Sequence, residues 1–179
     1  MATVAAASTG CAAGQRAQTA NEYSVVDGAS ANVGSMGLRN AGVTAPTSPV
    51  GYDQGATATL SMTVVNNGDS ADTLVSVSTP NAARATITAP TPTAASGAPP
   101  AAGGISVPAE GAVVVGPGTG AGKITLAGLT YRLVPGELVP VTVNFQVAGQ
   151  VVLQLPVKLV PGQTAGETVD VSPSTGSGP

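Results

Sequence analysis

The chain has 179 residues and a formal net charge of −3, and only 8% of its residues are charged. It contains no His and no Trp, one Phe and one Cys, beside 24 Gly and 15 Pro. The missing imidazole excludes an ordinary catalytic triad and a His-based metal centre, and six scattered basic residues give no footprint for nucleic acid. A single Cys excludes an internal disulfide. Strands rich in Val, Thr and Leu between frequent turn residues instead indicate an all-β sandwich.

The N-terminal segment 1–10, MATVAAASTG, places small residues directly before Cys11. This arrangement resembles the end of a bacterial lipoprotein signal peptide, where a lipid is attached to the Cys thiol and the chain is cut before it. Ser8 departs from the aliphatic residue usual at that position, and the basic start is missing. We expect residues 1–10 to be a residual signal segment, Cys11 to be lipidated and residues 11–22 to form a flexible tether. The alternative is a disordered tail with an incidental cysteine.

The folded domain is expected to span residues 23–160. Residues 23–26 and 31–38 are candidate opening strands, with Asp27-Gly28 as the turn between them, and residues 43–52 are expected to form a loop. No apolar run of 18 residues exists, so we do not expect this domain to cross a membrane.

The clearest strand of the first half covers residues 56–65. Apolar side chains alternate there with Thr and Ser, which is the period of two of a half-buried strand, and Met62 lies in phase with the core face. The N-N-G-D sequence at 66–69 is a strong turn signal. We therefore expect residues 72–79 to be the return strand of a hairpin, with Leu74 inward and the register of Val75 and Val77 unresolved. A short strand follows at 84–87.

Residues 89–104 are almost all Ala, Pro, Thr and Gly, and a loop of this length is expected to be mobile or used for contact. Residues 105–107 and 112–115 are predicted to form a hairpin around 108–111, and a further strand begins at 123.

The strongest hairpin signal lies at 138–158. Val141, Val143, Phe145 and Val147 share one face before a break at Ala148-Gly149, and the alternation resumes from Val151 to Val157. Pro156 cannot donate to a ladder, which places this second strand at a free edge. Residues 161–179 are expected to be a disordered tail. In all we count roughly eight to ten strands.

No arrangement of residues predicts catalysis. The carboxylates are scattered, and the nearest pairs lie in a turn and in the tail. The Gly-rich segment 116–120 lacks the Lys-Ser/Thr and the helix of a phosphate loop. We therefore expect no enzyme activity, no cofactor and no small-molecule substrate.

Residues 60–84 and 124–157 together resemble the PCuAC-type periplasmic copper chaperones. The first segment has a strand, an N-x-G-D turn and a D-x-L strand; the second has A-G-L, V-P-V-T-V, F-Q-V-A-G and L-P-V in the family's order. The resemblance implies a cupredoxin-like Greek-key β-sandwich.

The copper ligands of that family do not carry over. Its pattern has a His after the second strand pair, a His-x-Met before a Met-Gly-Leu run, and a further Met. Thr88 stands at the first of these positions, Lys123 and Thr125 at the second, and Ala127 before Gly-Leu. Protonated Lys and hydroxyls are poor ligands for Cu(I), which selects thioether and imidazole. We therefore expect no metal site.

The chain more closely resembles the mycobacterial LpqE-type lipoproteins. The residues that carry this likeness are C-A-A-G-Q at 11–15, Q-T-A-N at 18–21, L-R-N at 38–40 and G-L-T-Y at 128–131. The resemblance implies a lipid-anchored protein on the outer, periplasmic face of an actinobacterial plasma membrane. It also implies association with the cytochrome bc–cytochrome oxidase respiratory supercomplex as an accessory subunit.

Our main hypothesis is a non-enzymatic module that is anchored to the plasma membrane through acylated Cys11, for example with palmitate, and docks on respiratory supercomplex subunits. Residues 89–104 are the candidate contact loop. One alternative is a periplasmic copper chaperone or copper-delivery protein that binds metal in another way. Another is a carbohydrate-binding or adhesion domain, for which no aromatic platform is present. Ser/Thr/Pro clusters at 44–48, at 86–99 and in the tail from Ser172 are candidate O-mannosylation sites or plain linkers.

Overall fold

The computed structural model describes residues 28–89, 103–119 and 122–160. Within these ranges every extended regular element is a β-strand, and no helix is long and apolar enough to cross a membrane. Several expectations lie outside the described residues: the signal segment, Cys11, the tether, the strand at 23–26, most of the 89–104 loop and the tail at 161–179.

Ten strands make up the described chain, which confirms the expected all-β class and number. Their bounds are β1 Ala29–Val33, β2 Met36–Val43, β3 Thr57–Asn66, β4 Asp72–Ser78, β5 Ala82–Thr88, β6 Ile105–Val107, β7 Ala112–Val115, β8 Lys123–Leu129, β9 Leu138–Phe145 and β10 Gly149–Pro156.

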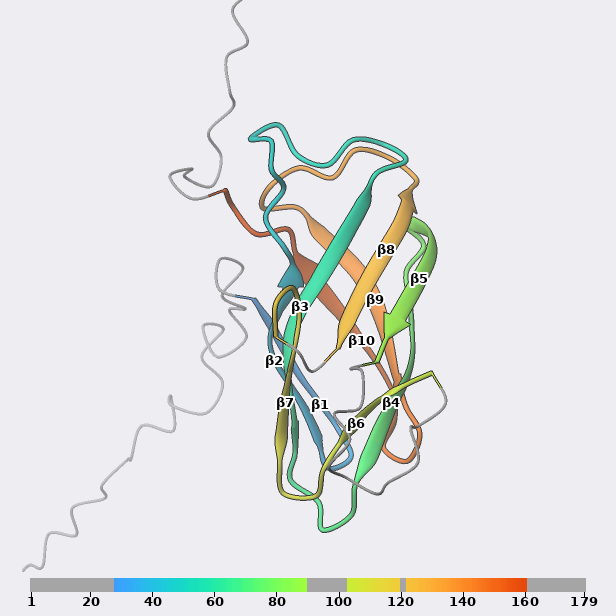
Figure 1. The fold of residues 1–179 in the computed structure, drawn as a ribbon. Helices are drawn as coiled ribbons and strands as arrows, with labels where there is room; N and C mark the ends of the chain where they lie inside the picture. The colour runs from blue at the N-terminus through green and yellow to red at the C-terminus, as the bar shows by residue number, and fades with distance from the viewer. Residues whose placement is uncertain (1–27, 90–102, 120–121, 161–179) are drawn as a thin grey trace, which may run out of the picture.

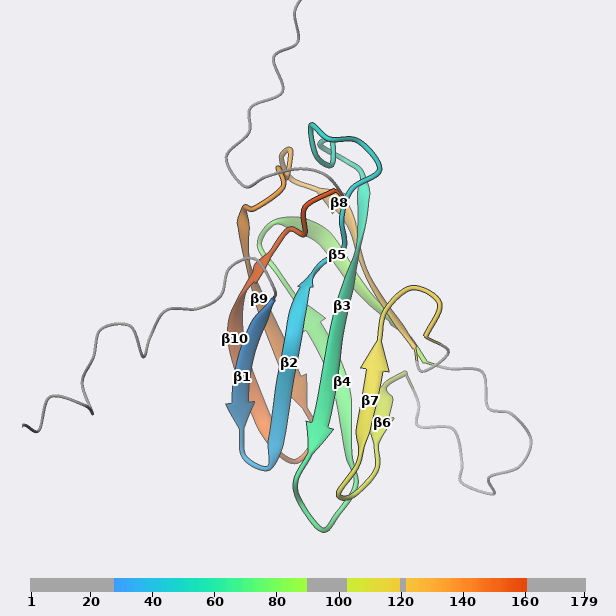
Figure 2. The same cartoon turned by 90° about the vertical axis from the view of Figure 1, so that its left-hand side faces the viewer.

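The strands form two antiparallel sheets that face each other as layers (Figures 1 and 2). We call the six-stranded sheet with the order β1-β2-β3-β8-β5 sheet I; β7 also pairs with β3 in it. The four-stranded sheet, sheet II, has the order β10-β9-β4-β6. Consecutive strands therefore often lie in different sheets. The chain crosses repeatedly between the two layers, which enclose one core.

The core lies between β3 of sheet I and β9 of sheet II. The predicted alternation is confirmed in both strands, because every second side chain is at most 2% exposed: Ala58, Leu60, Met62 and Val64 on β3, and Val139, Val141, Val143 and Phe145 on β9. Each fully buried Val, Leu or Phe side chain contributes on the order of 2 kcal/mol to folding through removal of apolar surface from water.

Two predicted hairpins are wrong. β4 does not return along β3 but pairs with β9 and β6 in sheet II, and β6 and β7 lie in different sheets. The physical reason is that β3 has no free edge: β2 covers one side, while β7 and β8 share the other. The turn at 67–71 is present, but it carries the chain from one layer to the other.

The first hairpin also differs from its prediction. Residues 31–38 are not one strand, because β1 and β2 are joined by a turn at Gly34-Ser35. Gly34 adopts φ +53°, a left-handed conformation that glycine takes without steric cost. A turn at Gly34 therefore divides the expected strand 31–38, whereas the expected turn at Asp27-Gly28 begins outside the described residues.

The β9–β10 hairpin is confirmed, and a buried carboxylate secures it. β9 ends at Phe145, so Val147 belongs to the turn and is 78% exposed, contrary to its expected place on the inner face. The Asp72 carboxylate is only 5% exposed and accepts hydrogen bonds from the backbone N–H groups of Val147, at 3.0 Å, and Ala148, at 2.8 Å. Asp72 thus joins the start of β4 to the turn after β9.

The two lateral sides of the sandwich differ. On one side β1 lies beside β10, and a parallel bridge between Val43 and Val157 connects the two sheets. This side holds the predicted edge strand, because β10 ends sheet II. On the other side sheet I ends at β5, which pairs only with β8 within the described ranges (Figure 1).

Candidate functional site

The residues at the expected ligand positions lie together on the outer face of β5 and β8. Thr88 and Lys123 are direct antiparallel partners, and Thr125 and Ala127 follow Lys123 at every second position of β8. The residues between them, Ile124 and Leu126, are fully buried and point into the core. The strand pairing therefore brings to one surface the positions that sequence comparison alone had grouped.

The donor chemistry at these positions does not suit Cu(I). An ammonium group such as that of Lys123 has no free electron pair, Thr hydroxyls are hard donors, and Ala127 offers no donor atom in its side chain. Among the described residues, no three His, Cys, Asp or Glu side chains gather where they could hold a metal ion. What this surface presents is positive charge beside hydroxyl groups, which suits an anionic group and not a soft cation.

Arg84 extends the same surface along β5. It pairs with Ala127, and between Arg84 and Lys123 runs a row of threonines from three adjacent strands, Thr59, Thr125 and Thr86. We call the surface made by Arg84, Thr86, Thr88, Lys123 and Thr125 the β5–β8 face. Arg84, Thr86, Thr88 and Lys123 are exposed, and Arg84 and Lys123 form no ion pair with a described residue.

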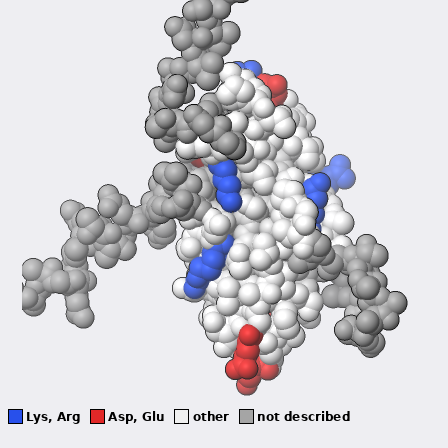
Figure 3. All heavy atoms as spheres, turned by 60° about the vertical axis from the view of Figure 1, so that its left-hand side comes forward, with Lys and Arg blue, Asp and Glu red and all other residues white. Residues whose placement is uncertain are grey.

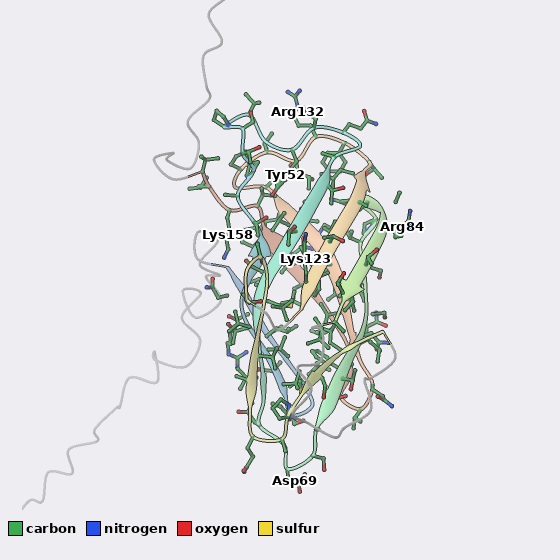
Figure 4. All side chains as sticks on the ribbon, viewed as in Figure 1. Tyr52, Asp69, Arg84, Lys123, Arg132 and Lys158 are labelled. Carbon is green, nitrogen blue, oxygen red and sulfur yellow. The ribbon has the colours of Figure 1, made fainter. Side chains whose placement is uncertain are left out.

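Apart from the buried Asp72, the acidic side chains of the described residues lie at the two ends of the molecule. At one end Asp53 binds Arg132 at 3.0 Å, and Glu137 accepts a hydrogen bond from the backbone of Val134. At the other end lies Asp69, with Glu110 in the adjoining turn. Figure 4 shows Arg132 and Asp69 at opposite ends, with Arg84 and Lys123 between them. In Figure 3 acidic atoms gather at the lower end, and most of the visible surface is uncharged.

The outer face of sheet II has a different character. Its side chains form cross-strand rows of amides, hydroxyls and one valine, namely Gln150–Asn144–Ser76 and Val152–Thr142–Ser78. No charged side chain points outward from the middle of this sheet within the described residues, because Asp72 is buried. The two faces are therefore chemically distinct, and only the face of sheet I can discriminate by charge.

Next to the Arg132–Asp53 pair, the Asn81 side chain meets Tyr131 of the 130–137 loop, which also carries Glu137. The Asn81 side-chain amide donates to the Tyr131 hydroxyl at 2.6 Å. Hydrogen bonding to Glu137, with burial and the negative charge of Glu137 as smaller causes, raises the pKa of Tyr131 above its ordinary value. This cluster fixes the 130–137 loop against the start of β5, so the loops at this end are held in place.

Sequence reasoning identified part of the β5–β8 face. Thr88, Lys123 and Thr125 were singled out, and the structure brings them together. Arg84 was missed, because its place in a predicted short strand at 84–87 did not show which strand lies beside it. The proposed contact loop leaves β5 at Thr88 and returns at β6; residues 90–102 of it lie outside the described ranges.

Comparison with protein families gives a match that covers most of the chain. The model of a family described as "Putative lipoprotein LpqE-like" matches residues 36–157, which include β2 to β10 and therefore both sheets. Among curated proteins, none matches this sequence.

Solved structures with the same fold include PCuAC domains. The apo PCuAC domain from PmoF1 is 22% identical, with a TM-score of 0.59 over 74% of this chain and 100% of that chain. The copper-bound PCuAC domain from PmoF2 is 21% identical, with a TM-score of 0.55 over 74% of this chain and 99% of that chain. At this identity the likeness establishes the fold alone, and it confirms the expected cupredoxin-like sandwich.

Proposed function

The chain belongs to the LpqE-like family, and from this membership we propose that it is a lipid-anchored, non-enzymatic docking module. It is held through acylated Cys11 on the outer face of the plasma membrane, and it serves as an accessory subunit of the cytochrome bc–cytochrome oxidase respiratory supercomplex. The family match over residues 36–157 is the observation that carries this proposal.

The geometry of the described residues supports a function in binding a partner and not in catalysing a reaction. The sandwich presents one face of amides and hydroxyls and one face on which Arg84 and Lys123 stand among threonines. His, the commonest general base, is absent from the sequence. The β5–β8 face keeps the strand pairing of the fold but carries Lys and Thr at the expected ligand positions. A surface of this kind binds through shape, hydrogen bonds and charge.

The test is co-purification from native membranes. An affinity-tagged full-length chain, solubilised in mild detergent, is expected to bring down cytochrome bc and cytochrome oxidase subunits. Mass spectrometry of its N-terminus is expected to show acyl chains on Cys11. The matched variant Cys11→Ala is expected to leave the membrane fraction and to lose these partners. Recovery of the acylated protein without any respiratory subunit would contradict the accessory role.

A second candidate, copper delivery, is favoured by the likeness of the fold to a copper-bound PCuAC domain. It requires ligands other than those of the β5–β8 face. Titration of the isolated protein with Cu(I) in the presence of a competing chelator separates the two functions. Stoichiometric binding that survives the competitor would support delivery, and its absence would leave the docking module.

A further inference from the structure

Among the strands that the structure describes, β5 is the one that ends sheet I on the side away from β1. It is seven residues long, contains no proline and pairs along its length with β8, while no described strand covers its other side. An uncovered edge exposes backbone N–H and C=O groups that can accept an additional strand. The opposite end of sheet I differs, because β1 packs beside β10.

The side chains of β5 give this edge a definite chemistry. Arg84, Thr86 and Thr88 point outward and are exposed, whereas Ala85 and Ile87 are partly buried and pack against the core. An added strand would therefore meet positive charge and hydroxyls on its outer side and apolar side chains on its inner side. Specificity in such strand addition comes from alternate side chains.

We propose that the free edge of β5 binds an extended acidic segment of a partner protein, which adds to sheet I as a further strand. Its carboxylates face Arg84 at one end and Lys123, reaching across Thr88, at the other. Arg84 and Thr88 are four residues apart, which is about 13 Å along a strand. The segment therefore carries two acidic residues in an i, i+4 relationship on the same face, with apolar residues between them.

Charge complementarity identifies this partner. Arg84 and Lys123 form no ion pair within the described chain, whereas Arg132 is paired with Asp53, and Arg39 donates to Asn32 and to two backbone carbonyls. No acidic side chain of the described chain lies on the β5–β8 face.

An anionic lipid surface fits this face less well. Membrane contact combines basic residues with inserted apolar side chains. The exposed large hydrophobic residues of the described chain lie elsewhere: Val50, Tyr131, Val134 and Leu138 at or beside the end loops, Val75, Val147 and Val152 on sheet II or its turn, and Val114 on β7. A protein segment that pairs with the β5 backbone would instead use the backbone groups, the positive charges and the hydroxyls that this face presents.

The inference rests on the proposed docking function and names the chemistry of its partner. Three capped synthetic peptides test it against the full-length protein by NMR: T-E-V-T-V-E-T, with both Glu on one face; T-E-V-T-E-V-T, with the Glu on opposite faces; and T-K-V-T-V-K-T. Only the first is expected to bind, with amide shifts confined to β5 and β8 and with weaker binding at high salt. Equal binding of all three, or shifts elsewhere, would overturn the proposal, as would no binding.

Charge reversal supplies the matched variants. Arg84→Glu with Lys123→Glu is expected to weaken binding of the first peptide by about tenfold or more and to create binding of the Lys peptide. Both side chains are exposed, so the fold is expected to survive, and Arg39→Glu on the same sheet serves as the control. Unchanged peptide selectivity in the double variant would overturn the role of these two charges.

The same double variant distinguishes failure of this inference from failure of the proposed function. If the wild-type chain co-purifies with respiratory subunits and the double variant does so equally well, the accessory role stands and the β5 edge is not the contact. If the wild-type chain brings down no respiratory subunit but binds the acidic peptide selectively, the edge is a recognition site for another partner.

Discussion

The Asp72 carboxylate accepts a hydrogen bond from the backbone N–H of Ala148, which lies 76 residues further along the chain. The same carboxylate also accepts from the N–H groups of Val147 and Thr73. Three backbone donors thus converge on one buried side chain, at the point where β4 starts and the β9–β10 turn ends. Such a charge-assisted cluster fixes the position of one strand against a distant turn.

The first prediction concerns this cluster. Asp72→Ala leaves the N–H groups of Val147 and Ala148 without their acceptor and is expected to lower the free energy of unfolding by about 3 kcal/mol. Urea unfolding followed by circular dichroism measures the change. Asp69→Ala, an exposed carboxylate in the neighbouring turn, is the control and is expected to change stability by less than about 0.5 kcal/mol. Equal effects of the two variants would show that the cluster contributes nothing.

The second prediction compares two glycines of the loop between β2 and β3. Gly51 and Gly55 both have positive φ, +111° and +80°, so a Cβ strains the backbone at either position. A Cβ at Gly51 would also collide with the carbonyl oxygen of Leu133, whereas at Gly55 it would meet nothing within 4 Å. Gly51→Ala is therefore expected to destabilise the protein by several kcal/mol and Gly55→Ala by about 1 kcal/mol. Thermal unfolding of both variants checks the order, which a reversed result would contradict.

The sequence pattern predicted the positions of the strands well, but it predicted poorly which strands pair with each other. Alternation in 56–65 and 138–158 gave the buried faces correctly, because a period of two depends only on which side of the strand meets the core. Strand pairing, in contrast, depends on the whole sheet. β4 does not pair with β3, because β2 lies along one edge of β3 while β7 and β8 share the other. The ambiguity between Val75 and Val77 has a local cause, since an irregularity between Leu74 and Ser76 shifts the alternation and buries Val77.

The third prediction concerns pH. Because the folded state raises the pKa of Tyr131 above its unfolded value near 10, its contribution to stability is complete below that value and is lost as pH rises through the folded pKa. Stability is therefore expected to fall in this alkaline range, by a small amount because the side chain is 41% exposed. Tyr131→Phe is expected to remove that part of the decline, measured by denaturant unfolding across the range.

Glu137 is the group that raises this pKa, so Glu137→Gln is expected to lower the pKa of Tyr131 towards its ordinary value. NMR titration of the tyrosine ring carbon bonded to oxygen follows the residue directly. Asp53→Asn removes a carboxylate at the same end of the sandwich that binds Arg132, and it is the control. A larger effect of Asp53→Asn than of Glu137→Gln would contradict the assigned cause.

The fourth prediction restores soft ligands to the β5–β8 face. The triple variant Thr88→His, Lys123→His and Thr125→Met places imidazole and thioether groups on adjacent strands whose pairing already brings these positions together. It is expected to bind Cu(I) stoichiometrically and more tightly than the wild-type chain, measured by competition with a chelator. The scattered variant Thr57→His, Asn144→His and Gln154→Met, of the same composition, is the control. Equal affinity in both variants would show that β5 and β8 do not form a metal-binding geometry.

The candidate site was predictable only in part, for a related reason. The resemblance grouped Thr88, Lys123 and Thr125 because ligand positions of one site can be compared along a sequence. Arg84 belongs to no ligand pattern and becomes relevant only through its pairing with Ala127. The free edge of β5 could not be read from the sequence at all, since the edge is defined by the absence of a neighbouring strand within the described fold.

The bridge between Val43 and Val157 joins residues that are 114 positions apart in the chain. Contacts over such a separation form late, because the entropy of closing so long a loop has to be overcome before they stabilise anything. A nascent chain that still lacks β10 leaves one edge of β9 and the end of β2 open to water and to proteases. Synthesis of the segment up to Val157 therefore sets the earliest moment at which this domain becomes resistant to degradation, and a truncation before residue 157 is expected to be cleared by the cell.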